Sequence, residues 1–216
     1  MKIHQSLAVW LIRKVQKYGP HKVRVHGKTY LTSEDVFNPK YYYTSSFMAK
    51  KIKVNSGDTV LDMGTGSGIQ AITAGQHASK VVAVDINPEA VRFARKNVRS
   101  NNLEEVITVL EGDLFGPLDR GRRFNVIIFT PPYMCGERAT VFDHALFDSD
   151  KGLLRRFFTG AKDFIEADGN IQMLYSSIAH PEEALKISRD IGWKDILISE
   201  EKTFSESFMI YKLVLD

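Results

Sequence analysis

An acid and three glycines follow a short apolar run, and their spacing has chemical consequences. Residues 59–69 read TVLDMGTGSGI, so Asp62 precedes Gly64, Gly66 and Gly68, and single residues separate the three glycines. Apolar residues resume at once after the last glycine, and this order predicts a buried strand, a tight turn and a helix. Because glycine has no Cβ, such a turn lets backbone N–H groups approach a ligand closely.

The glycine turn by itself fits two classes of cofactor. From Gly66 onward the pattern is G-x-G-x-x-A, and Asp85 follows at about the distance that is typical of dinucleotide-binding folds. An NAD(P)-dependent oxidoreductase is therefore one hypothesis. The carboxylate of Asp62 argues against it, because this group would repel a pyrophosphate and instead suits a ligand with an ammonium or sulfonium cation.

Two further acids stand at the ends of the next two predicted strands. Asp85 lies in the run 81–86, and Asp113 follows the run 106–110. Taken singly, Asp62 and Asp113 fit strand-end residues that accept hydrogen bonds from turn amides. Parallel strands bring their carboxyl ends to one edge of a sheet, where ligands bind. Acids at three such ends predict a shared ligand site.

A proline-rich corner follows the fourth apolar run. This run, 124–130, continues into Thr130, Pro131, Pro132 and Tyr133. Two adjacent prolines fix the backbone and cannot donate hydrogen bonds, so carbonyl groups at the strand end stay available. The tyrosine offers a flat face to a planar group. A plain proline turn is the structural alternative, but the position of the corner at the same sheet edge favours a substrate site.

These motifs, in this order, resemble those of class I S-adenosylmethionine-dependent methyltransferases over residues 36–215. In that family the acidic glycine turn holds the methionine part of the cofactor. The acid of the second strand binds the ribose hydroxyls, the next residue lies against the adenine, and the acid after the third strand recognises the adenine amino group. The resemblance therefore implies S-adenosylmethionine as the cofactor, held by Asp62, Gly64, Gly66, Gly68, Asp85, Ile86, Asp113 and Leu114.

The proline corner resembles the (Asn/Asp/Ser)-Pro-Pro-(Tyr/Phe) motif of methyltransferases that act on planar nitrogens, namely glutamine amides and exocyclic base amines. In those enzymes the first side chain and the first proline carbonyl accept the two N–H bonds and orient the nitrogen. The resemblance implies that Thr130, Pro131, Pro132 and Tyr133 form the catalytic corner. Thr130 stands where asparagine is usual in the glutamine and adenine enzymes; a hydroxyl accepts the same bond, but it is shorter and also donates.

The segments 85–91 and 148–153 resemble the methyltransferase small domain group in particular. That group includes release-factor glutamine methyltransferases and RNA guanine and adenine methylases. The resemblance implies a macromolecular acceptor, either RNA or a translation factor. Residues 1–53 do not clearly match the helical substrate domain of the bacterial release-factor enzymes, since they are shorter and contain a hairpin pattern.

Strands alternate with helices from residue 58 onward, which predicts an α/β fold with a parallel sheet covered on both faces. The last two strands have no helix between them, so they should form an antiparallel pair at one edge. The fold class expected is a Rossmann-like, seven-stranded sheet with an antiparallel edge strand; the resemblance places the seventh strand at that edge. The predicted strands are 59–63, 81–86, 106–110, 124–130, 170–175, 195–199 and 207–215, and the predicted helices are 69–77, 88–100, 151–166 and 181–191.

The first quarter of the chain has a different character. An amphipathic helix is expected at 5–17, a hairpin at 22–32 and a short helix from residue 46 to 52, after the aromatic residues 41–43. Residues 1–53 hold 11 Lys and Arg against two acids, an excess of +9, whereas the remainder carries −6. This charge fits either a solvated surface or a footprint for nucleic acid or the ribosome. The expected division is an extension with a lid at 1–53 and a methyltransferase domain at 54–216.

Composition limits the expected cellular location and the expected metal content. The 216 residues contain one cysteine and no apolar run long enough to span a membrane, so a cytoplasmic enzyme is expected. The six histidines lie far apart, and no metal site is expected. Cys135 is interpreted as a pocket-lining residue, and Asp143 with His144 as either a solvated loop or a proton acceptor. The hypothesis is an S-adenosylmethionine-dependent N-methyltransferase; the alternatives are an NAD(P)-dependent oxidoreductase and a non-catalytic cofactor- or RNA-binding module.

Overall fold

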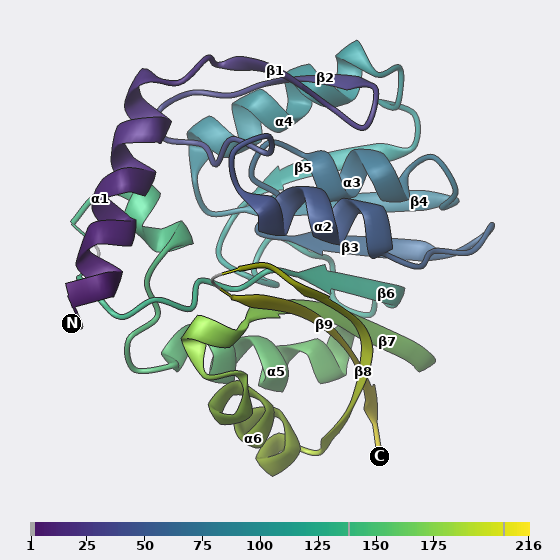
Figure 1. Ribbon diagram of the computed structural model, residues 1–216. Helices are drawn as coiled ribbons and strands as arrows, with labels where there is room; N and C mark the ends of the chain where they lie inside the picture. Colours follow the sequence, from purple (N-terminus) through teal and green to yellow (C-terminus); the bar gives the residue numbers. More distant parts are fainter. Residues whose placement is uncertain (1–2, 138, 205) are drawn as a thin grey trace.

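A seven-stranded sheet with helices on both faces forms the centre of the molecule (Figure 1). The computed structural model describes residues 3–137, 139–204 and 206–216, with side chains from Trp10 onward. The strands of this sheet are β3 (Thr59–Met63), β4 (Lys80–Asp85), β5 (Ile107–Glu111), β6 (Phe124–Phe129), β7 (Ile165–Ser176), β8 (Trp193–Lys202) and β9 (Ser207–Leu215). The predicted bounds of β3 and β9 are confirmed, and β7 begins five residues earlier than the predicted 170.

The helices begin and end where local chemistry favours it. Helix α4 is capped by Asn87, whose side chain accepts from the backbone N–H of Glu89, and Pro88 takes its first position, as predicted. Helix α6 begins at a proline and ends before Gly192, which has a left-handed φ of 100°. The helices are α1 (Ile3–Tyr18), α2 (Tyr43–Lys51), α3 (Ile69–Ala74), α4 (Pro88–Ser100), α5 (Gly152–Phe164) and α6 (Pro181–Ile191), with short 3-10 turns η1 (Val141–Ala145) and η2 (Ser177–Ala179).

The strand order is β5-β4-β3-β6-β7-β9-β8. The first five strands in this order run parallel, and β9 is antiparallel to both of its neighbours. The expected antiparallel pair at one edge is therefore confirmed. The seventh strand, β9, lies beside the sixth, β8, as the resemblance implied, and because β9 is inserted between β7 and β8, the outermost strand is β8. The eleven-residue helix α6 lies between β7 and β8 in the sequence, whereas only a short turn joins β8 to β9. Strand β9 therefore folds back along β8 and pairs with β7 on its other side.

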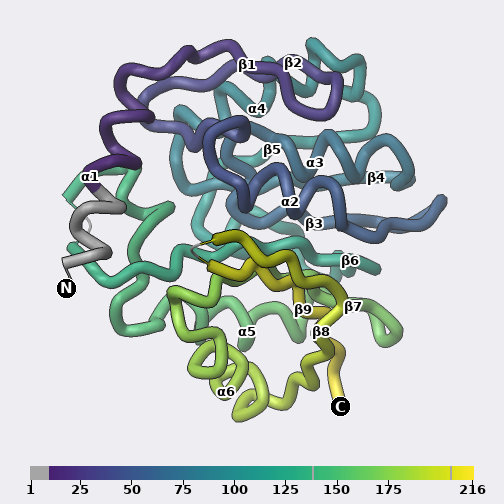
Figure 2. The backbone as a smooth tube through the Cα atoms, in the orientation of Figure 1, coloured from purple at the N-terminus to yellow at the C-terminus, as the bar shows by residue number. Residues whose placement is uncertain are grey.

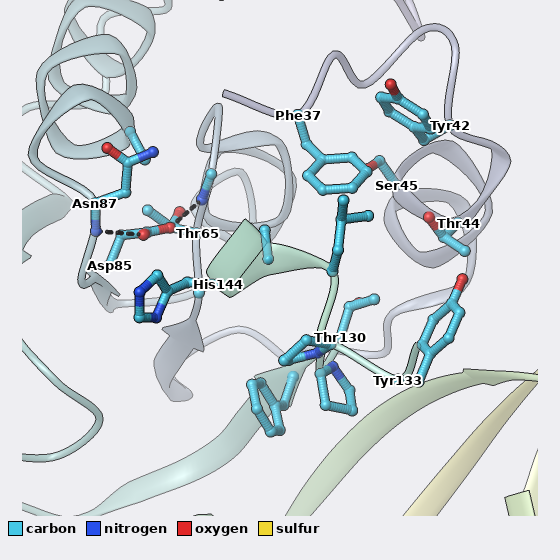
Figure 3. A pocket seen from close by; sticks show the side chains of 18 of the residues that line it. Phe37, Tyr42, Thr44, Ser45, Thr65, Asp85, Asn87, Thr130, Tyr133 and His144 are labelled. Carbon is cyan, nitrogen blue, oxygen red and sulfur yellow. Dashed lines mark hydrogen bonds between the residues drawn. The ribbon is translucent and has the colours of Figure 1, made fainter. Parts of the chain in front are cut away.

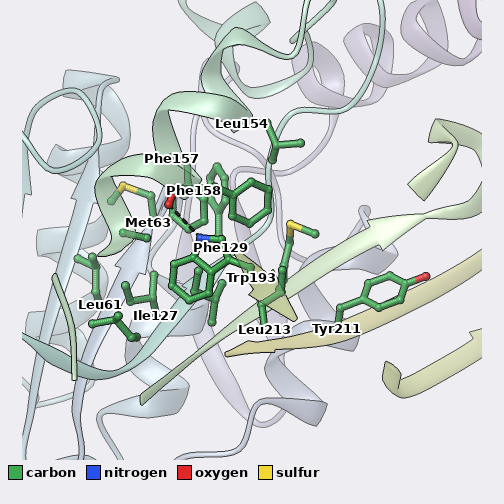
Figure 4. Close-up of a cluster of buried hydrophobic side chains, with 14 of the residues drawn as sticks. Leu61, Met63, Ile127, Phe129, Leu154, Phe157, Phe158, Trp193, Tyr211 and Leu213 are labelled. Atoms are coloured by element: carbon green, nitrogen blue, oxygen red, sulfur yellow. Dashed lines mark hydrogen bonds between the residues drawn. The ribbon is translucent and has the colours of Figure 1, made fainter. Parts of the chain in front are cut away.

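Each face of the sheet carries its own hydrophobic cluster, because successive side chains of a strand point to opposite faces. Leu61 packs toward α5 and α6, where it joins Phe157, Phe158 and Trp193 (Figure 4). The Trp193 indole N–H donates to the Phe158 carbonyl over 3.0 Å, so this buried polar group has a partner. Val60, the preceding residue, packs toward α2, α3 and α4 on the other face.

The N-terminal hairpin is part of the second cluster. Its strands are β1 (Lys22–Val25) and β2 (Lys28–Leu31), and Val23 and Tyr30 are buried with the residues of α2, α3 and α4. The fully buried Asn97 of α4 accepts from the Leu31 N–H over 2.7 Å, and its amide donates to the carbonyls of Leu31 and Ser67. The hairpin is therefore tied through α4 to the glycine turn.

Figure 2 shows the backbone path from α1 through the hairpin and back to α2, along the side of the molecule that carries α4. The predicted helix, hairpin and second helix are all found, although α2 begins at Tyr43, three residues earlier than expected. Within the described parts of the chain, no helix is long and apolar enough to cross a membrane.

Candidate active site

A cavity of about 900 Å³ lies at the carboxyl ends of β3, β4 and β6. Its walls come from the glycine turn, the strand ends, the proline corner and the N-terminal segment, which are distant in sequence (Figure 3). The predicted site residues among its lining are Asp62, Gly64, Gly66, Asp85, Ile86, Asp113, Leu114, Thr130, Pro131, Pro132 and Tyr133. Gly68 is the one predicted site residue outside this lining, and it is the N-cap of α3.

The glycine turn takes a backbone conformation that favours glycine. Gly64, Gly66 and Gly68 have φ values of 70°, 55° and 83°, in the region that L side chains rarely adopt. Space is open around Gly64 and Gly66, whereas a Cβ on Gly68 would meet Ala94 of α4 at 3.4 Å. The first two glycines are thus required by conformation, and the third by conformation together with close helix packing.

Asp62 holds the turn together from inside. Its side chain is about 1% exposed, and its Oδ2 accepts from the Thr65 hydroxyl over 2.6 Å and from the Ala71 N–H over 2.9 Å. Burial raises the pKa of Asp62 to about 7, although these two hydrogen bonds oppose the shift. A cation placed beside this carboxylate would favour its ionised form.

Asp85 links the glycine turn to the next helix. Its Oδ2 accepts from the Gly66 N–H over 2.8 Å, and its Oδ1 accepts from the Asn87 N–H over 2.9 Å (Figure 3). Burial raises the pKa of Asp85, and the backbone hydrogen bonds act in the opposite direction. Ile86 follows with an exposed side chain that borders the cavity.

Asp113 has a partner that the sequence did not indicate. Both of its carboxylate oxygens accept from one guanidinium nitrogen of Arg156 on α5, over 2.6 and 2.8 Å. Both side chains are about half exposed and border the cavity. Leu114, beside them, has a left-handed φ of 50°. A ligand group that reaches Asp113 therefore meets an ion pair rather than an isolated carboxylate.

The proline corner contains a polar atom without a partner. The hydroxyl oxygen of Thr130 is buried, and none of the described residues forms a hydrogen bond with it. The Tyr133 ring packs against Tyr175 with centroids 5.4 Å apart. Burial raises the pKa of Tyr133, so it stays a neutral phenol. The corner thus offers a hydroxyl and an aromatic face to the cavity.

Aromatic residues of the N-terminal segment line one side of the cavity and form its roof, namely Phe37, Tyr41, Tyr42 and Tyr43. Phe37 stacks on Phe142 at 4.8 Å between centroids and meets the edge of Tyr42 at 4.4 Å. The Tyr42 hydroxyl donates to the carbonyl of Ile12 over 3.0 Å, which joins the roof to α1. Tyr43 is bonded to Glu201 of β8 through its hydroxyl.

The loop that follows Tyr133 differs in two respects from what the sequence predicted for Cys135 and Asp143. Cys135 is exposed and does not line the cavity, because the neighbouring Met134 takes the inward position. Asp143 is fully buried, and its carboxylate accepts from Arg13 and from the N–H groups of Ala139 and Thr140. Its side chain is therefore not solvated, and none of these hydrogen bonds involves His144. Of Cys135, Asp143 and His144, only His144 borders the cavity. Arg138 lies outside the described residues.

Gln70 is a cavity residue that sequence reasoning missed. It is buried in α3, its amide nitrogen donates to the Ser45 carbonyl over 3.1 Å, and its Oε1 is buried without a partner among the described residues. The available signal was a polar residue in the otherwise apolar start of a helix. Gln70 and Thr130 therefore both leave buried oxygen acceptors at one cavity.

The donor and acceptor content of the cavity fits S-adenosylmethionine. The buried carboxylate of Asp62, the partly exposed carboxylate of Asp85, and the oxygens of Gln70 and Thr130 that have no partner among the described residues favour a ligand with positive charge and hydrogen-bond donors. The cofactor offers a sulfonium, an ammonium and ribose hydroxyls. A dinucleotide would instead bring a pyrophosphate against these carboxylates.

Comparisons with known proteins agree with this assignment. Residues 29–191 match the family model described as methyltransferase small domain. The chain is 30% identical over 196 residues to a putative protein N5-glutamine methyltransferase of Methanocaldococcus jannaschii, covering 88% of this chain and 93% of that protein. It is 33% identical over 150 residues to a ribosomal protein uL3 glutamine methyltransferase of Bradyrhizobium diazoefficiens, covering 62% of this chain and 45% of that protein.

Solved structures share the fold. A tRNA methyltransferase of M. jannaschii superposes with a TM-score of 0.67 at 22% identity, over 90% of this chain and 54% of that one. A 16S rRNA methyltransferase of T. thermophilus, solved with S-adenosylmethionine and guanosine, gives 0.68 at 17% identity, over 90% of this chain and 50% of that one. The chain thus spans about half the length of these two structures. It belongs to the methyltransferase small domain family and is an S-adenosylmethionine-dependent methyltransferase, which disfavours the oxidoreductase interpretation of its glycine turn.

Proposed function

We propose that this enzyme methylates a planar nitrogen of a macromolecule, held at the corner formed by Thr130, Pro131, Pro132 and Tyr133. The observation that carries the proposal is the buried, unpaired hydroxyl of Thr130, which borders the same cavity as the glycine turn. A buried acceptor without a partner costs about 1–3 kcal/mol. A substrate N–H that occupies this position would remove that cost.

In this proposal the glycine turn and the strand ends hold the cofactor. Asp62, with Gly64, Gly66 and Gly68, receives the methionine part, and the Asp85 carboxylate accepts from the ribose hydroxyls. The exposed side chain of Ile86 lies against the adenine. Asp113 accepts from the adenine amino group while the ion pair with Arg156 holds its carboxylate in place, and Leu114 lies beside it. When bound, the cofactor supplies a methyl group on a sulfonium, which leaves as a neutral thioether.

The corner orients the acceptor nitrogen. Thr130 Oγ1 and the Pro131 carbonyl accept its two N–H bonds, Pro132 keeps the turn rigid, and Tyr133 packs against the plane of the amide or base. The nitrogen gains the methyl group and releases one proton to solvent, and the other product is S-adenosylhomocysteine. Positioning supplies most of the acceleration, because the leaving group is good and the nitrogen needs only the correct direction of approach.

The acceptor is a macromolecule, RNA or a translation factor. The relatives named above act on glutamine residues of proteins, and the solved structures of similar fold act on tRNA and rRNA. Residues 1–53 act as an extension and lid that receive this acceptor, and residues 54–216 form the methyltransferase domain. We propose a cytoplasmic location, which such acceptors and the single cysteine support.

Transfer of labelled methyl groups from S-adenosylmethionine into a cell lysate tests this proposal. The lysate is separated afterwards into RNA, DNA, protein and small-molecule fractions. Label in RNA or protein, carried on nitrogen after hydrolysis, is expected. Tight cofactor binding without transfer into any fraction would contradict the proposal and favour a non-catalytic binding module.

A further inference from the structure

The outer face of α1 combines aromatic rings with lysines. Trp10 is 55% exposed and Tyr18 is 70% exposed, although both are large side chains that folding normally covers. Trp10, Lys14, Lys17 and Tyr18 share this face, because residues four, seven and eight positions apart lie together on a helix. None of the four lines the cavity.

The lysines of this face lie close to its rings. The Lys14 ammonium is 5.7 Å from the centre of the Trp10 ring and 5.4 Å from that of Tyr18, and the Lys17 ammonium is 5.7 Å from the Tyr18 ring. These cation–π contacts order the lysine side chains along the aromatic surface. The outer face of α1 thus alternates planar rings with positive charges.

The helix is fixed in place beside the cavity. Gln16 donates to the Ser33 carbonyl over 2.6 Å and accepts from the Asn38 N–H, and Arg13 pairs with the buried Asp143 over 2.7 Å. Next to the outer face, the half-exposed side chains of Leu11 and Val15 border the cavity. A flexible chain bound on the outer face therefore has a short path over these two residues to the proline corner.

We propose that the outer face of α1, formed by Trp10, Lys14, Lys17 and Tyr18, binds single-stranded RNA next to the base that is methylated. This inference rests on the proposed function and selects RNA as the acceptor. Bases stack on exposed aromatic rings in a sequence-tolerant way, and lysines between the rings contact phosphates. A protein-binding surface of this size would carry few lysines at its centre. The excess of +9 in residues 1–53 points in the same direction.

Binding of a fluorescein-labelled single-stranded RNA of mixed sequence, measured by anisotropy over a salt series, tests the inference. The double variant Trp10→Ala/Tyr18→Ala should weaken binding about tenfold or more because base stacking is lost. The variant Lys14→Glu/Lys17→Glu should also weaken it and reduce the salt slope by about 1.4, or 0.7 for each lost phosphate contact. S-adenosylmethionine affinity should be unchanged in both.

A matched control carries the same charge change elsewhere. Lys186 and Lys194 are exposed near α6 and β8, and Lys186→Glu/Lys194→Glu should leave RNA binding within about twofold of the wild type. Equal weakening in this control, or RNA binding that is indifferent to the α1 variants, would overturn the inference.

The methyl-transfer assay separates this inference from the proposed function. In one outcome the label appears in protein, the α1 variants reduce it, and the enzyme does not bind RNA. The outer face of α1 would then bind a protein partner, so the inference would fail while the proposed function stands. RNA binding that depends on α1, with no transfer into any fraction, would uphold the RNA surface and contradict the proposed function. Label in RNA that both α1 variants reduce supports the two together.

Discussion

The cavity has two halves that satisfy their polar groups differently. In the cofactor half, the buried carboxylate of Asp62 and the partly exposed carboxylate of Asp85 accept hydrogen bonds from the glycine turn, from α3 and from the N-cap of α4. In the acceptor half, the buried hydroxyl of Thr130 has no partner among the described residues. The cofactor half is therefore organised by the chain itself, whereas the acceptor half depends on its ligand.

This difference separates stability from function. A carboxylate that also holds a turn contributes to both, so its removal affects folding and binding together. A buried hydroxyl without a partner destabilises the folded chain, so only binding or catalysis explains its presence. Gln70 is the exception in the cofactor half, because its Oε1 is also unpaired. Five experiments test this contrast, from the largest expected effect to the smallest.

The largest effect is expected for Asp85→Ala. Calorimetry should show a loss of S-adenosylmethionine affinity of about 1.5–3 kcal/mol for each charge-assisted bond to the ribose. Stability should fall as well, because the Gly66 N–H loses its acceptor. Glu111→Ala is the control, since this exposed acid is paired in register with Asp85 across β4 and β5 but does not line the cavity. Unchanged affinity in Asp85→Ala would remove this residue from the cofactor site.

Tyr133→Ala should impair the acceptor half of the cavity and leave the cofactor half intact. We expect kcat to fall about a hundredfold, close to 2.7 kcal/mol of transition-state stabilisation, because the acceptor loses its flat support. Cofactor affinity should stay at the wild-type value. Tyr133→Phe keeps the ring and should keep most of the rate; an equally impaired Phe variant would instead assign the role to the hydroxyl.

Thr130→Val should raise stability and lower activity. The variant removes a buried hydroxyl for which the described part of the chain offers no partner, so the free energy of unfolding should rise by up to about 1 kcal/mol. The rate should fall about tenfold, because one hydrogen bond to the acceptor nitrogen is lost. Thr130→Ser, which keeps the hydroxyl, should retain activity. A Val variant that is both less stable and fully active would show that the hydroxyl serves the fold.

Gln70→Leu tests whether the unpaired Oε1 of Gln70 in the cofactor half serves cofactor binding. The substitution removes the unpaired Oε1 but also the bond to the Ser45 carbonyl. We expect cofactor affinity to fall about fivefold, with a smaller effect on kcat. Gln70→Glu keeps an acceptor at this position and should restore affinity in part. Affinity that is unchanged in the Leu variant would leave Gln70 as a link between α2 and α3 only.

The smallest effect on cofactor affinity concerns pH. The folded chain binds the Asp62 proton more tightly than the unfolded chain, since burial raises this pKa from 3.8 to about 7. The stability contributed by this group is therefore present below the unfolded pKa and is lost as the pH rises through about 7. A cationic cofactor favours the ionised form, so its affinity should rise a few-fold over the same interval. Asp62→Asn should flatten both dependences; an unaltered pH profile would contradict the assignment.

Much of the fold was predictable from local patterns. Glycine spacing, the capping Asn87 with Pro88, and the alternation of apolar runs predicted the strand–turn–helix order, and the structure confirms it. The insertion of β9 between β7 and β8 was not predictable in this way, because the pairing of strands that are distant in sequence depends on which partner lies within reach after folding. The same holds for Cys135, whose exposure depends on Met134 taking the inward position.

The sequence by itself determined the chemistry at the sheet edge. Short motifs indicated this chemistry: the acids and glycines at the strand ends, and the proline corner after β6. They could be interpreted together because a parallel sheet brings these strand ends to one edge. Only the tertiary structure decided which of them have partners: Arg156 is 43 residues from Asp113, and Ser45 is 25 residues from Gln70. It also decided that the Thr130 hydroxyl has no partner among the described residues, since hydrogen bonds between distant residues depend on how helices and loops pack over the sheet.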